Sequence, residues 1–511
     1  MSTTSPETDP SRDAENPAFD DLTSAISGVV VSSDSVKTKK NSSKNKILIG
    51  CFIVVIGAIA IGLGYFFGTR TSSSSSIEDV THTEGEIVDE DDSVDENNAE
   101  KKEEEKSLGP QDVPSTKTLL WNQVGDALVG TQSRQFFGAG VSTNRDGSAI
   151  AIISKAHKNF YKEIDGNWMA LEQVCGFCKD TYGDAFDPDF VDPDSESGWG
   201  VTMSADGNIA SFGASFSNFG IGYVRKLNET SGIYESFGQP FYGDEIIDEF
   251  GCSPVMSEDG STFAAAALAG DYVRFYEQSK SDNSDHWQVS GSIEIMNLGF
   301  FRSQFLGLSG DGSRAAVSVP FEGVKIIDRK ESGNWEITAS INFINATEVF
   351  GLSVALSFSG ERVLISDPRM KNEEDIATGG ILVYSQDTTT REWSQLGNTM
   401  YGENPADYFG FSCSISSDGT RVAGGAHGDQ GNFMVGYVKV FDFEEGSWNQ
   451  VGQQIIGSEP HVADWFGYDF ALSYDGNRLI SGAMLYSGNE TNSFKGQVTI
   501  FELVEKEVDS V

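Results

Sequence analysis

One segment of the chain brings together carboxylates at a spacing that could bind a metal ion. The segment Asp184–Gly198, DAFDPDFVDPDSESG, contains the acidic side chains Asp184, Asp187, Asp189, Asp192 and Asp194. Calcium takes about six to eight oxygen ligands, many of them carboxylates, so this segment could form a calcium site or a patch for a cationic partner. The alternative is a solvated acidic insertion. Because loops often carry binding residues, this segment is the candidate ligand site that the sequence favours.

A second set of aspartates recurs in a Ser-x-Asp-Gly pattern, or Asn-x-Asp-Gly in its first copy. Its members are Asp146, Asp206, Asp259, Asp311, Asp418 and Asp475, and Ser359 takes this place in one further copy. A calcium loop needs several acids at alternate positions, whereas only one carboxylate is regular here. Asp-Gly between alternating apolar segments is typical of a hairpin, because Asp tolerates and Gly readily adopts left-handed backbone geometry. We interpret these aspartates as turn residues.

The pair Cys175 and Cys178 forms a Cys-x-x-Cys motif. Redox chemistry would need the motif at a helix N-terminus in a βαβ unit, and no such pattern surrounds it. A zinc site would need two more ligands, and no second pair is evident. In an oxidising compartment a local disulfide is the favoured interpretation. Cys252 and Cys413 lie in apolar segments and are expected to be buried.

Sequence motifs for catalysis are absent. None of the five histidines falls in His-Glu-x-x-His, and there is neither a Gly-x-Ser-x-Gly motif nor a phosphate-binding loop. A glycosidase-type carboxylate pair could still be present among the 77 acidic residues. The net charge of −42 argues against nucleic acid as a partner, because few cations are available to displace counterions from phosphates. No cofactor other than calcium is indicated.

The elements that must position these side chains belong to an internal repeat. Its clearest copies are FGLSVALSFSGERVLIS from Phe350, FGFSCSISSDGTRVAGG from Phe409 and FGYDFALSYDGNRLISG from Phe466. Copies from Phe137 and Phe250 follow the same pattern, and two degenerate copies begin near Gly198 and Arg302. A third apolar alternation and a tryptophan segment follow, as in GYVKVFD and WNQVG after Gly436. Each of the seven units is therefore predicted to form four short strands.

The ends of the repeat array predict that it closes into a ring. The segment WNQVG also occurs at Trp121, before the first unit, whereas the last unit ends at GQVTIFELVE without a tryptophan segment. The N-terminal copy can supply the strand that the last unit lacks. We therefore predict an all-β fold, a seven-bladed β-propeller over residues 117–505, in which an N-terminal strand closes the last blade.

The Phe-Gly unit with its Ser-x-Asp-Gly turn resembles the FG-GAP repeat of integrin α-chain propellers, and the turn is similar to that of WD-repeat propellers. The resemblance covers all seven units, five of which carry Phe-Gly. It implies a recognition or adhesion module that binds a protein or a glycan at a propeller face. The Asp-box of sialidase propellers, Ser-x-Asp-x-Gly-x-x-Trp, differs from the turn in this chain. Propellers have many unrelated functions, so the resemblance is more informative for fold.

The N-terminal part of the chain predicts a membrane anchor. Residues 47–67 carry no charge, and as a helix they would extend roughly 31 Å, about the thickness of a hydrocarbon layer. Five lysines precede the segment closely and one arginine directly follows it, which places the N-terminus in the cytosol. We therefore expect a single-pass type II membrane protein whose propeller is extracellular or lies in the lumen of the secretory pathway.

The segments around the anchor predict disorder. Residues 1–46 are expected to form a disordered cytosolic tail, and residues 506–511 a short C-terminal tail. Residues 68–116 contain a serine run and a stretch, Glu78–Glu105, with fourteen acids and two lysines, which is expected to form an extended stalk. Sequons at Asn228, Asn345 and Asn489 are candidate glycosylation sites in the exported part.

These observations favour a membrane-anchored recognition or adhesion module in which no chemistry is evident. Two alternatives remain. One is a lumenal glycan-processing enzyme, which would need converging polar residues and a carboxylate pair at the central channel. The other is a structural protein that tethers a cell wall or matrix through cations bound by its acidic segments.

Overall fold

The computed structural model describes residues 116–155, 157–175, 200–215, 220–245, 248–279, 285–298, 304–343, 347–428, 436–457, 464–488, 490 and 493–508. These residues belong to one compact unit, Ser107–Val511. Among them, no helix has the length and apolar character needed to cross a membrane. The apolar segment 47–67, the segment Asp184–Gly198, Cys178, Asn345 and Asn489 lie outside the described residues.

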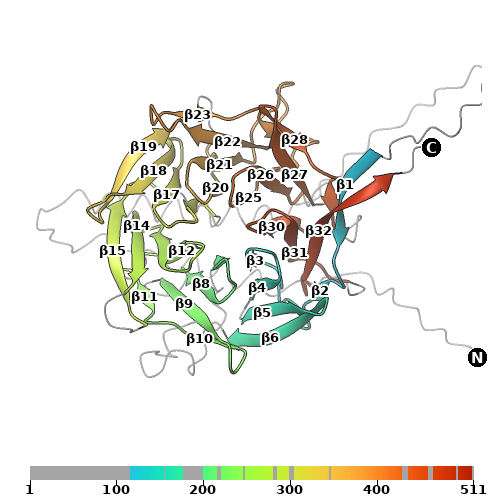
Figure 1. Ribbon diagram of the computed structural model, residues 1–511, viewed down its shortest axis with the longest axis horizontal. Coiled ribbons are helices and arrows are strands. Elements are labelled where there is room, and N and C mark those ends of the chain that lie inside the picture. The colour runs from blue at the N-terminus through green and yellow to red at the C-terminus, as the bar shows by residue number, and fades with distance from the viewer. Residues whose placement is uncertain are drawn as a thin grey trace, which may run out of the picture. The chain divides into compact units, whose positions relative to one another are not determined.

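The described strands form seven antiparallel sheets around a central axis (Figure 1). This confirms the prediction of an all-β, seven-bladed propeller. The first three blades contain β3 (Gly140–Thr143), β4 (Ala149–Ser154), β5 (His157–Ile164) and β6 (Asn167–Cys175); β7 (Val201–Met203), β8 (Ile209–Ala214), β9 (Ile221–Asn228) and β10 (Ile233–Ser236); and β12 (Phe250–Met256), β13 (Thr262–Ala267), β14 (Tyr272–Gln278) and β15 (Trp287–Glu294).

The remaining blades repeat this order from the axis outward. They contain β16 (Leu306–Leu308), β17 (Arg314–Val319), β18 (Gly323–Arg329) and β19 (Trp335–Ile341); β20 (Val354–Leu356), β21 (Arg362–Asp367), β22 (Gly380–Gln386) and β23 (Trp393–Gln395); β25 (Ser412–Ile415), β26 (Arg421–Ala426), β27 (Tyr437–Glu444) and β28 (Ser447–Gln450); and β30 (Phe466–Leu472), β31 (Arg478–Ala483), β32 (Gln497–Val508) and β1 (Thr116–Gln123). Four two-residue strands pair beside the third strand of their blades: β2 (Leu128–Val129), β11 (Phe241–Tyr242), β24 (Met400–Tyr401) and β29 (Ile455–Ile456).

Burial explains the composition of the second strand in each blade. Every residue of β4, β8, β13 and β17 is buried, because these strands have a partner on both sides and a neighbouring blade on each face. Strands covered on both faces are apolar throughout rather than alternating. Strand β13 accordingly reads TFAAAA, in which small side chains allow close packing between blades.

The last blade is closed by the N-terminal strand, as the repeated WNQVG segment predicts. Strand β1 pairs antiparallel with β32, and Trp121 lies opposite Leu503. The Trp121 side chain is 2% exposed, and its indole Nε1 donates a hydrogen bond to the Val451 carbonyl of the preceding blade at 3.0 Å. The two ends of the array therefore meet within one sheet (Figure 1).

The outer strands of adjacent blades are joined by side-chain amides. Gln453 accepts a hydrogen bond from the Trp121 amide at 3.0 Å and donates one to the Trp121 carbonyl at 2.6 Å. Asn398 makes the same pair of bonds with Trp448, at 2.7 and 3.4 Å. Because one amide side chain satisfies both backbone groups, it fixes the register between neighbouring blades without a continuous sheet.

The phenylalanine-glycine pairs of the repeat also serve blade packing. Gly467 has φ +77°, and a Cβ at this position would lie 2.6 Å from the Tyr437 carbonyl oxygen of the preceding blade. A side chain here would be strained and would push the two blades apart. The pair is therefore retained where the chain passes close to the preceding blade.

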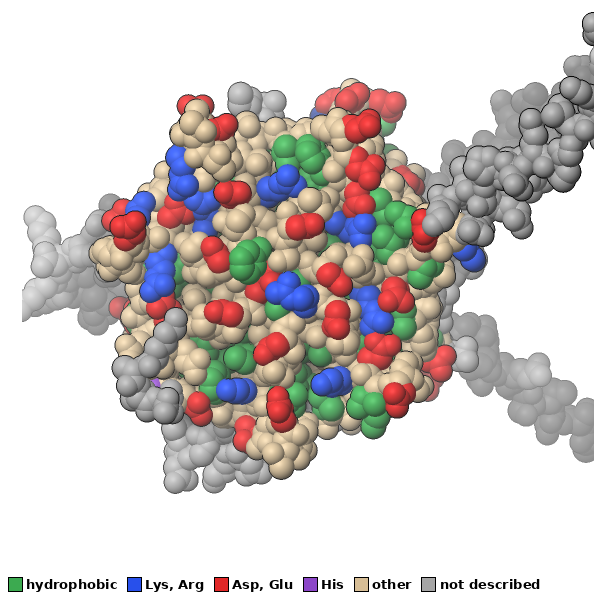
Figure 2. Space-filling view, in the orientation of Figure 1, with side chains coloured by type: hydrophobic (Ala, Val, Ile, Leu, Met, Phe, Trp, Pro, Cys, Tyr) green, Lys and Arg blue, Asp and Glu red, His purple; other side chains and the backbone are tan. Residues whose placement is uncertain are grey.

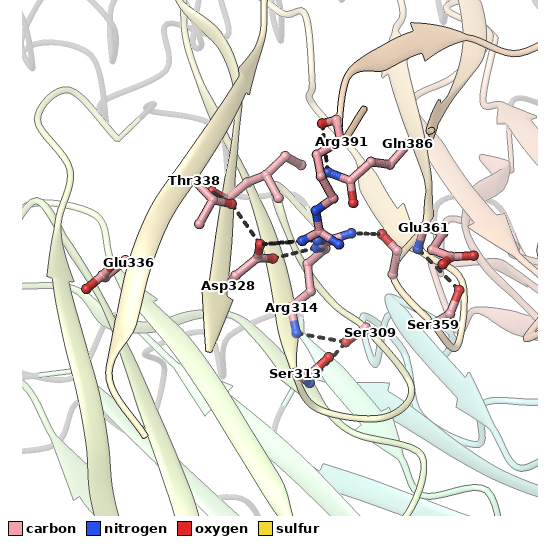
Figure 3. Close-up of polar contacts among 12 residues, drawn as sticks. Ser309, Ser313, Arg314, Asp328, Glu336, Thr338, Ser359, Glu361, Gln386 and Arg391 are labelled. Carbon is pink, nitrogen blue, oxygen red and sulfur yellow. Dashed lines mark hydrogen bonds and ion pairs between the residues drawn. The ribbon is translucent and has the colours of Figure 1, made fainter. Parts of the chain in front are cut away.

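Arginines that follow the turns between the first and second strands form a further set of contacts between blades. Arg314 pairs with Asp328 (Nε to Oδ1, 2.5 Å) and donates through Nη1 to the Gly360 carbonyl of the next blade at 2.9 Å. Figure 3 shows Arg314 and Arg391 meeting at Asp328, which also accepts a hydrogen bond from Thr338. Arg362 and Arg421 also donate through Nη1 to the carbonyl of the turn glycine in the next blade, Gly419 and Gly476 respectively, each at 2.8 Å.

Candidate functional site

The aspartates of the Asp-Gly turns bond to their own turns. In one of them, Asp418 Oδ1 accepts hydrogen bonds from Ser416 Oγ at 2.6 Å and from the Thr420 amide at 2.9 Å. Burial raises the pKa of Asp418, but these hydrogen bonds lower it by more, so the carboxylate is held ionised. The carboxylates of Asp206, Asp259, Asp311 and Asp475 make the same bonds, and Asp146 bonds to Ser148. No group of three or more His, Cys, Asp or Glu residues placed to hold a metal ion occurs in the described ranges.

The seven turns are joined into a closed ring of backbone hydrogen bonds around the axis, which we call the turn ring. Each turn donates an amide to the carbonyl of the next turn, at distances between 2.7 and 3.1 Å. The bonds run from Arg145 to Ala205, Ala205 to Glu258, Glu258 to Gly310, Asp311 to Phe358, Phe358 to Ser417, Ser417 to Tyr474 and Asp475 to Arg145. The residue before each turn aspartate therefore lies at the axis, a position that the sequence pattern left as a variable x.

Side chains from the turn ring meet across the axis and form a floor. Arg145 Nη2 lies 2.7 Å from Glu258 Oε2, and Ser417, on a distant blade, donates to the other oxygen of Glu258. Tyr474 donates its hydroxyl to the Met203 carbonyl at 2.6 Å.

Figure 2 shows acidic and basic side chains interspersed over one face of the molecule, without a continuous patch of either sign. That face therefore offers no uniform field to steer a charged partner.

Above this floor, the innermost strands enclose a cavity of about 210 Å³, which we call the axial cavity. Every blade contributes to its wall, mainly with backbone, small apolar and hydroxyl groups. Among the described lining residues there is no Lys or Arg, and Asp469 is the only carboxylate. These residues do not supply the carboxylate pair that a glycosidase would need at the channel.

Asp469 is held at the seam between the last and the first blade. Its Oδ2 accepts the Val141 amide at 2.8 Å, whereas Oδ1 lies 3.3 Å from Gln304 Nε2 and 3.5 Å from Ser412 Oγ. The residue is 8% exposed. Burial raises the pKa of Asp469 to about 7, although hydrogen bonds from Val141, Phe470 and Ser412 oppose the rise. The carboxylate therefore carries a cost when it is ionised in the folded protein.

Five half-buried rings gather beside the cavity, on blades 6 and 7. They are Tyr408, Phe411, His427, Trp465 and Tyr468, which we call the aromatic rim. The His427 ring lies 4.4 Å from the Phe411 ring and 5.3 Å from the Trp465 ring, measured between centroids. Trp465 stacks on Tyr468 at 5.2 Å, and both Phe411 and Tyr468 line the cavity. The rim therefore continues the cavity wall at the end opposite the turn ring.

The backbone of the aromatic rim is strained, and one of its polar atoms lacks a partner. Tyr408 and Trp465 precede their Phe-Gly pairs with φ of 55° and 60°, a conformation that bulky residues rarely adopt. The indole Nε1 of Trp465 is buried and has no hydrogen-bond partner among the described residues. The same left-handed backbone precedes Phe-Gly at Phe136 and Glu249, with φ of 51° and 53°, so this conformation belongs to the repeat and only the unsatisfied indole donor is left as a feature of the rim.

Sequence reasoning missed the aromatic rim and Asp469. Both leave a trace in the repeat, because YFGF at Tyr408 and WFGY at Trp465 carry aromatics on both sides of Phe-Gly. The fourth position of this motif is serine in FGCS, FGLS and FGFS but aspartate in FGYD. An aspartate that precedes Phe-Gly, Asp407, instead accepts two turn amides and the Tyr437 hydroxyl, the last at 2.6 Å.

The other candidate residues are separate from this site. The predicted calcium ligands Asp184, Asp187, Asp189, Asp192 and Asp194 lie outside the described residues, as do Cys178, Asn345 and Asn489. Cys175 ends β6, and Cys252 and Cys413 are buried on the inner strands of their blades. Asn228 ends β9, where its side-chain oxygen accepts the Thr230 amide at 3.0 Å. None of these described residues belongs to the aromatic rim.

Replacing Asp469 with asparagine is expected to stabilise the protein by about 2 kcal/mol at pH 8. Since the folded-state pKa is about 7 against 3.8 in the unfolded chain, the stability that protonation gives is present at low pH and is lost as the pH rises toward 7. Asparagine keeps an oxygen for the Val141 amide without the charge. Urea denaturation at pH 8 and pH 5 should show that the difference in the free energy of unfolding between the variant and wild type is smaller at pH 5. A variant less stable than wild type at pH 8 would show instead that the fold needs the charge.

Comparisons with known proteins give the following similarities. No family model matches the chain, and no curated protein is similar to it in sequence. Among solved structures, the Cps50 (Swd1) β-propeller domain of Myceliophteria thermophila matches at a TM-score of 0.47 and 11% identity, over 75% of this chain and 100% of that domain. A chain of the mitotic checkpoint complex matches at a TM-score of 0.46 and 12% identity, over 79% of this chain and 97% of that chain. The periplasmic gluconolactonase of Pseudomonas aeruginosa matches at a TM-score of 0.41 and 14% identity, over 64% of this chain and 85% of that chain.

Proposed function

We propose that this protein is a recognition module that binds a protein or glycan partner at the aromatic rim and the axial cavity. The observation that carries the proposal is the rim itself, in which five half-buried rings border a cavity floored by the turn ring. Small-molecule and peptide sites are concave, mostly apolar and supplied with a few placed polar groups. Asp469, which lines the axial cavity, is such a group here.

The chemistry of the cavity favours binding over catalysis. The described lining offers one carboxylate among hydroxyl, thiol, amide and apolar groups, whereas glycoside hydrolysis uses a pair of carboxylates around the scissile bond. Aromatic side chains, in contrast, are the anchors that dominate the energetics of binding sites. The resemblance of the repeats to FG-GAP propellers supports the same interpretation, because it implies adhesion or recognition.

We further propose that the propeller is displayed on a membrane by residues 47–67. The uncharged twenty-one-residue segment and the lysines before it support a type II anchor. In this arrangement the propeller would face the extracellular space or a secretory lumen. Glycans at Asn228, Asn345 and Asn489 would be consistent with that location.

The test is a binding screen of the full-length chain in detergent micelles against glycan and peptide arrays. We expect at least one ligand to bind wild type and to bind Trp465→Ala at least tenfold more weakly. Phe358→Ala is the matched control, because Phe358 is a 45% exposed aromatic of the turn ring, and this variant should bind normally. Loss of binding in the Phe358 variant but not in the Trp465 variant would place the ligand on the opposite face, and no binding on either array would contradict a recognition role.

A further inference from the structure

We propose that the axial cavity accepts a primary ammonium group on an alkyl stem, with Asp469 as its counter-ion and the aromatic rim around its stem. This inference rests on the proposed function, since it names the ligand chemistry of the same site. Two sources share this chemistry: the lysine side chain of a protein partner and a free polyamine.

The charge balance of the cavity is the first argument. Asp469 is buried at 8% exposure, and no Lys or Arg lines the cavity in the described part of the chain. A buried carboxylate without a cation is costly, because the interior replaces hydration poorly. A ligand ammonium would supply the missing opposite charge where the surroundings screen it least.

The second argument is that the seam does not need a carboxylate at this position. In three other blades the equivalent residue is serine (Ser253, Ser353 and Ser412), and two of these serines perform the same structural task. Ser253 Oγ accepts the Leu306 amide of the next blade at 3.1 Å, and Ser353 Oγ accepts the Cys413 amide at 3.1 Å. Asp469 accepts the Val141 amide with one oxygen only. The charge is therefore additional to the structural role.

The second oxygen of Asp469 is available to a ligand. Oδ1 has two long side-chain contacts, 3.3 Å to Gln304 and 3.5 Å to Ser412, both at the cavity wall. A charge-assisted hydrogen bond from an ammonium would be shorter, at about 2.8 Å, and stronger than either contact. The hydroxyl of Ser412 and the amide oxygen of Gln304 could accept the remaining ammonium protons.

The aromatic rim provides the third argument, because it lies where the stem of such a ligand would pass. Tyr468 and Phe411 directly precede Asp469 and Ser412 in sequence, and both line the cavity. Aromatic faces attract cations and also pack against methylene groups. A cavity of about 210 Å³ holds about seven water volumes, enough for an ammonium and a four-carbon stem. A neutral sugar would leave the carboxylate without a counter-charge.

The experiment is calorimetric titration of the full-length chain at pH 8 with three probes. These are Nα-acetyl-lysine N-methylamide, cadaverine and the uncharged analogue Nα-acetyl-norleucine N-methylamide. We expect the two ammonium probes to bind, the norleucine probe to bind at least tenfold more weakly, and Asp469→Asn to weaken ammonium binding at least tenfold. Tighter binding of the lysine probe would indicate a protein partner, and tighter binding of cadaverine a free polyamine.

Asp469→Ser, which introduces the residue found in three other repeats, is the second variant, and its thermal melting checks that the fold is kept. Equal binding of the norleucine and lysine probes, or ammonium binding unchanged in both Asp469 variants, would overturn the proposal. If the arrays show Trp465-dependent binding while the ammonium probes fail, only the ligand class is wrong. If the arrays and the ammonium probes both fail, the recognition role fails as well.

Discussion

Replacing Lys158 with methionine is expected to raise the free energy of unfolding by about 4 kcal/mol at pH 6. Lys158 on β5 is 1% exposed, and its Nζ has no hydrogen-bond partner among the described residues. The nearest compensation is the Phe212 ring of the next blade, whose centroid lies 5.7 Å away. In five other blades the equivalent position is β-branched and aliphatic: Val273, Val324, Ile381, Val438 and Val498.

The pH dependence of this effect has a defined sign. Burial lowers the pKa of Lys158 to about 7, from 10.5 in the unfolded chain. Between these values the unfolded chain binds more protons, so the stability of wild type rises with pH. The methionine variant lacks this pH dependence, so the difference in the free energy of unfolding between the two proteins should become small near pH 10. Urea denaturation at pH 6, 8 and 10 measures this difference.

Lys439→Met is the matched control for Lys158→Met. Lys439 on β27 is also buried, at 7% exposure, but its Nζ lies 2.8 Å from Glu403 Oε1. Removing a paired lysine leaves a carboxylate without its partner, so this variant should not be stabilised. If Lys158→Met destabilised the protein at pH 6, a carboxylate outside the described residues would have to pair with Lys158.

Replacing Trp121 with alanine is expected to lower the free energy of unfolding by about 4 kcal/mol, because it removes a large buried side chain at the closure of the ring. The variant loses the indole hydrogen bond to Val451 and the packing in the apolar cluster between blades 6 and 7. Hydrogen exchange should increase most in β32, the strand that β1 covers. Urea denaturation and exchange mass spectrometry of peptides from residues 497–508 test both parts.

Trp448→Ala provides the comparison, since Trp448 is 3% exposed and donates through Nε1 to the Leu396 carbonyl at 2.8 Å. Its strand, β28, continues covalently from β27, whereas β1 and β32 come from opposite ends of the array. We therefore expect a similar loss of global stability without faster exchange in β32. Unchanged exchange in β32 of the Trp121 variant would mean that β1 contributes little to closure.

The propeller could be predicted because its determinants are local and repeat. Asp-Gly turns recur in six of the seven units, period-two alternation and tryptophan segments recur along the chain, and the extra copy at Trp121 specifies closure. Each of these features acts within one blade or between adjacent strands. Agreement among seven imperfect copies compensates for the degenerate ones near Gly198 and Arg302.

The binding site could not be predicted in the same way, because it is made of departures from the repeat. Tyr408 and Trp465 belong to successive units, and both contact His427 only when blades 6 and 7 pack together. Asp469 differs from the serines at its position, but its burial arises only when the last blade lies against the first. Lys158 follows a histidine in a segment with alternating polar residues, which gives no sign that its amino group is buried.

The turn ring has a consequence for how this surface can evolve. Its seven hydrogen bonds use backbone groups only, so they do not depend on the side chain at the variable position. Those seven residues are Arg145, Ala205, Glu258, Gly310, Phe358, Ser417 and Tyr474, and no two are of the same type. Substitutions at Ala205 and at the exposed Phe358 can therefore accumulate while the backbone ring keeps its geometry, whereas Gly310 and the paired Arg145, Glu258 and Ser417 are restricted by their neighbours. New specificities could arise at the centre of this face first at the positions whose side chains are not bound into the floor.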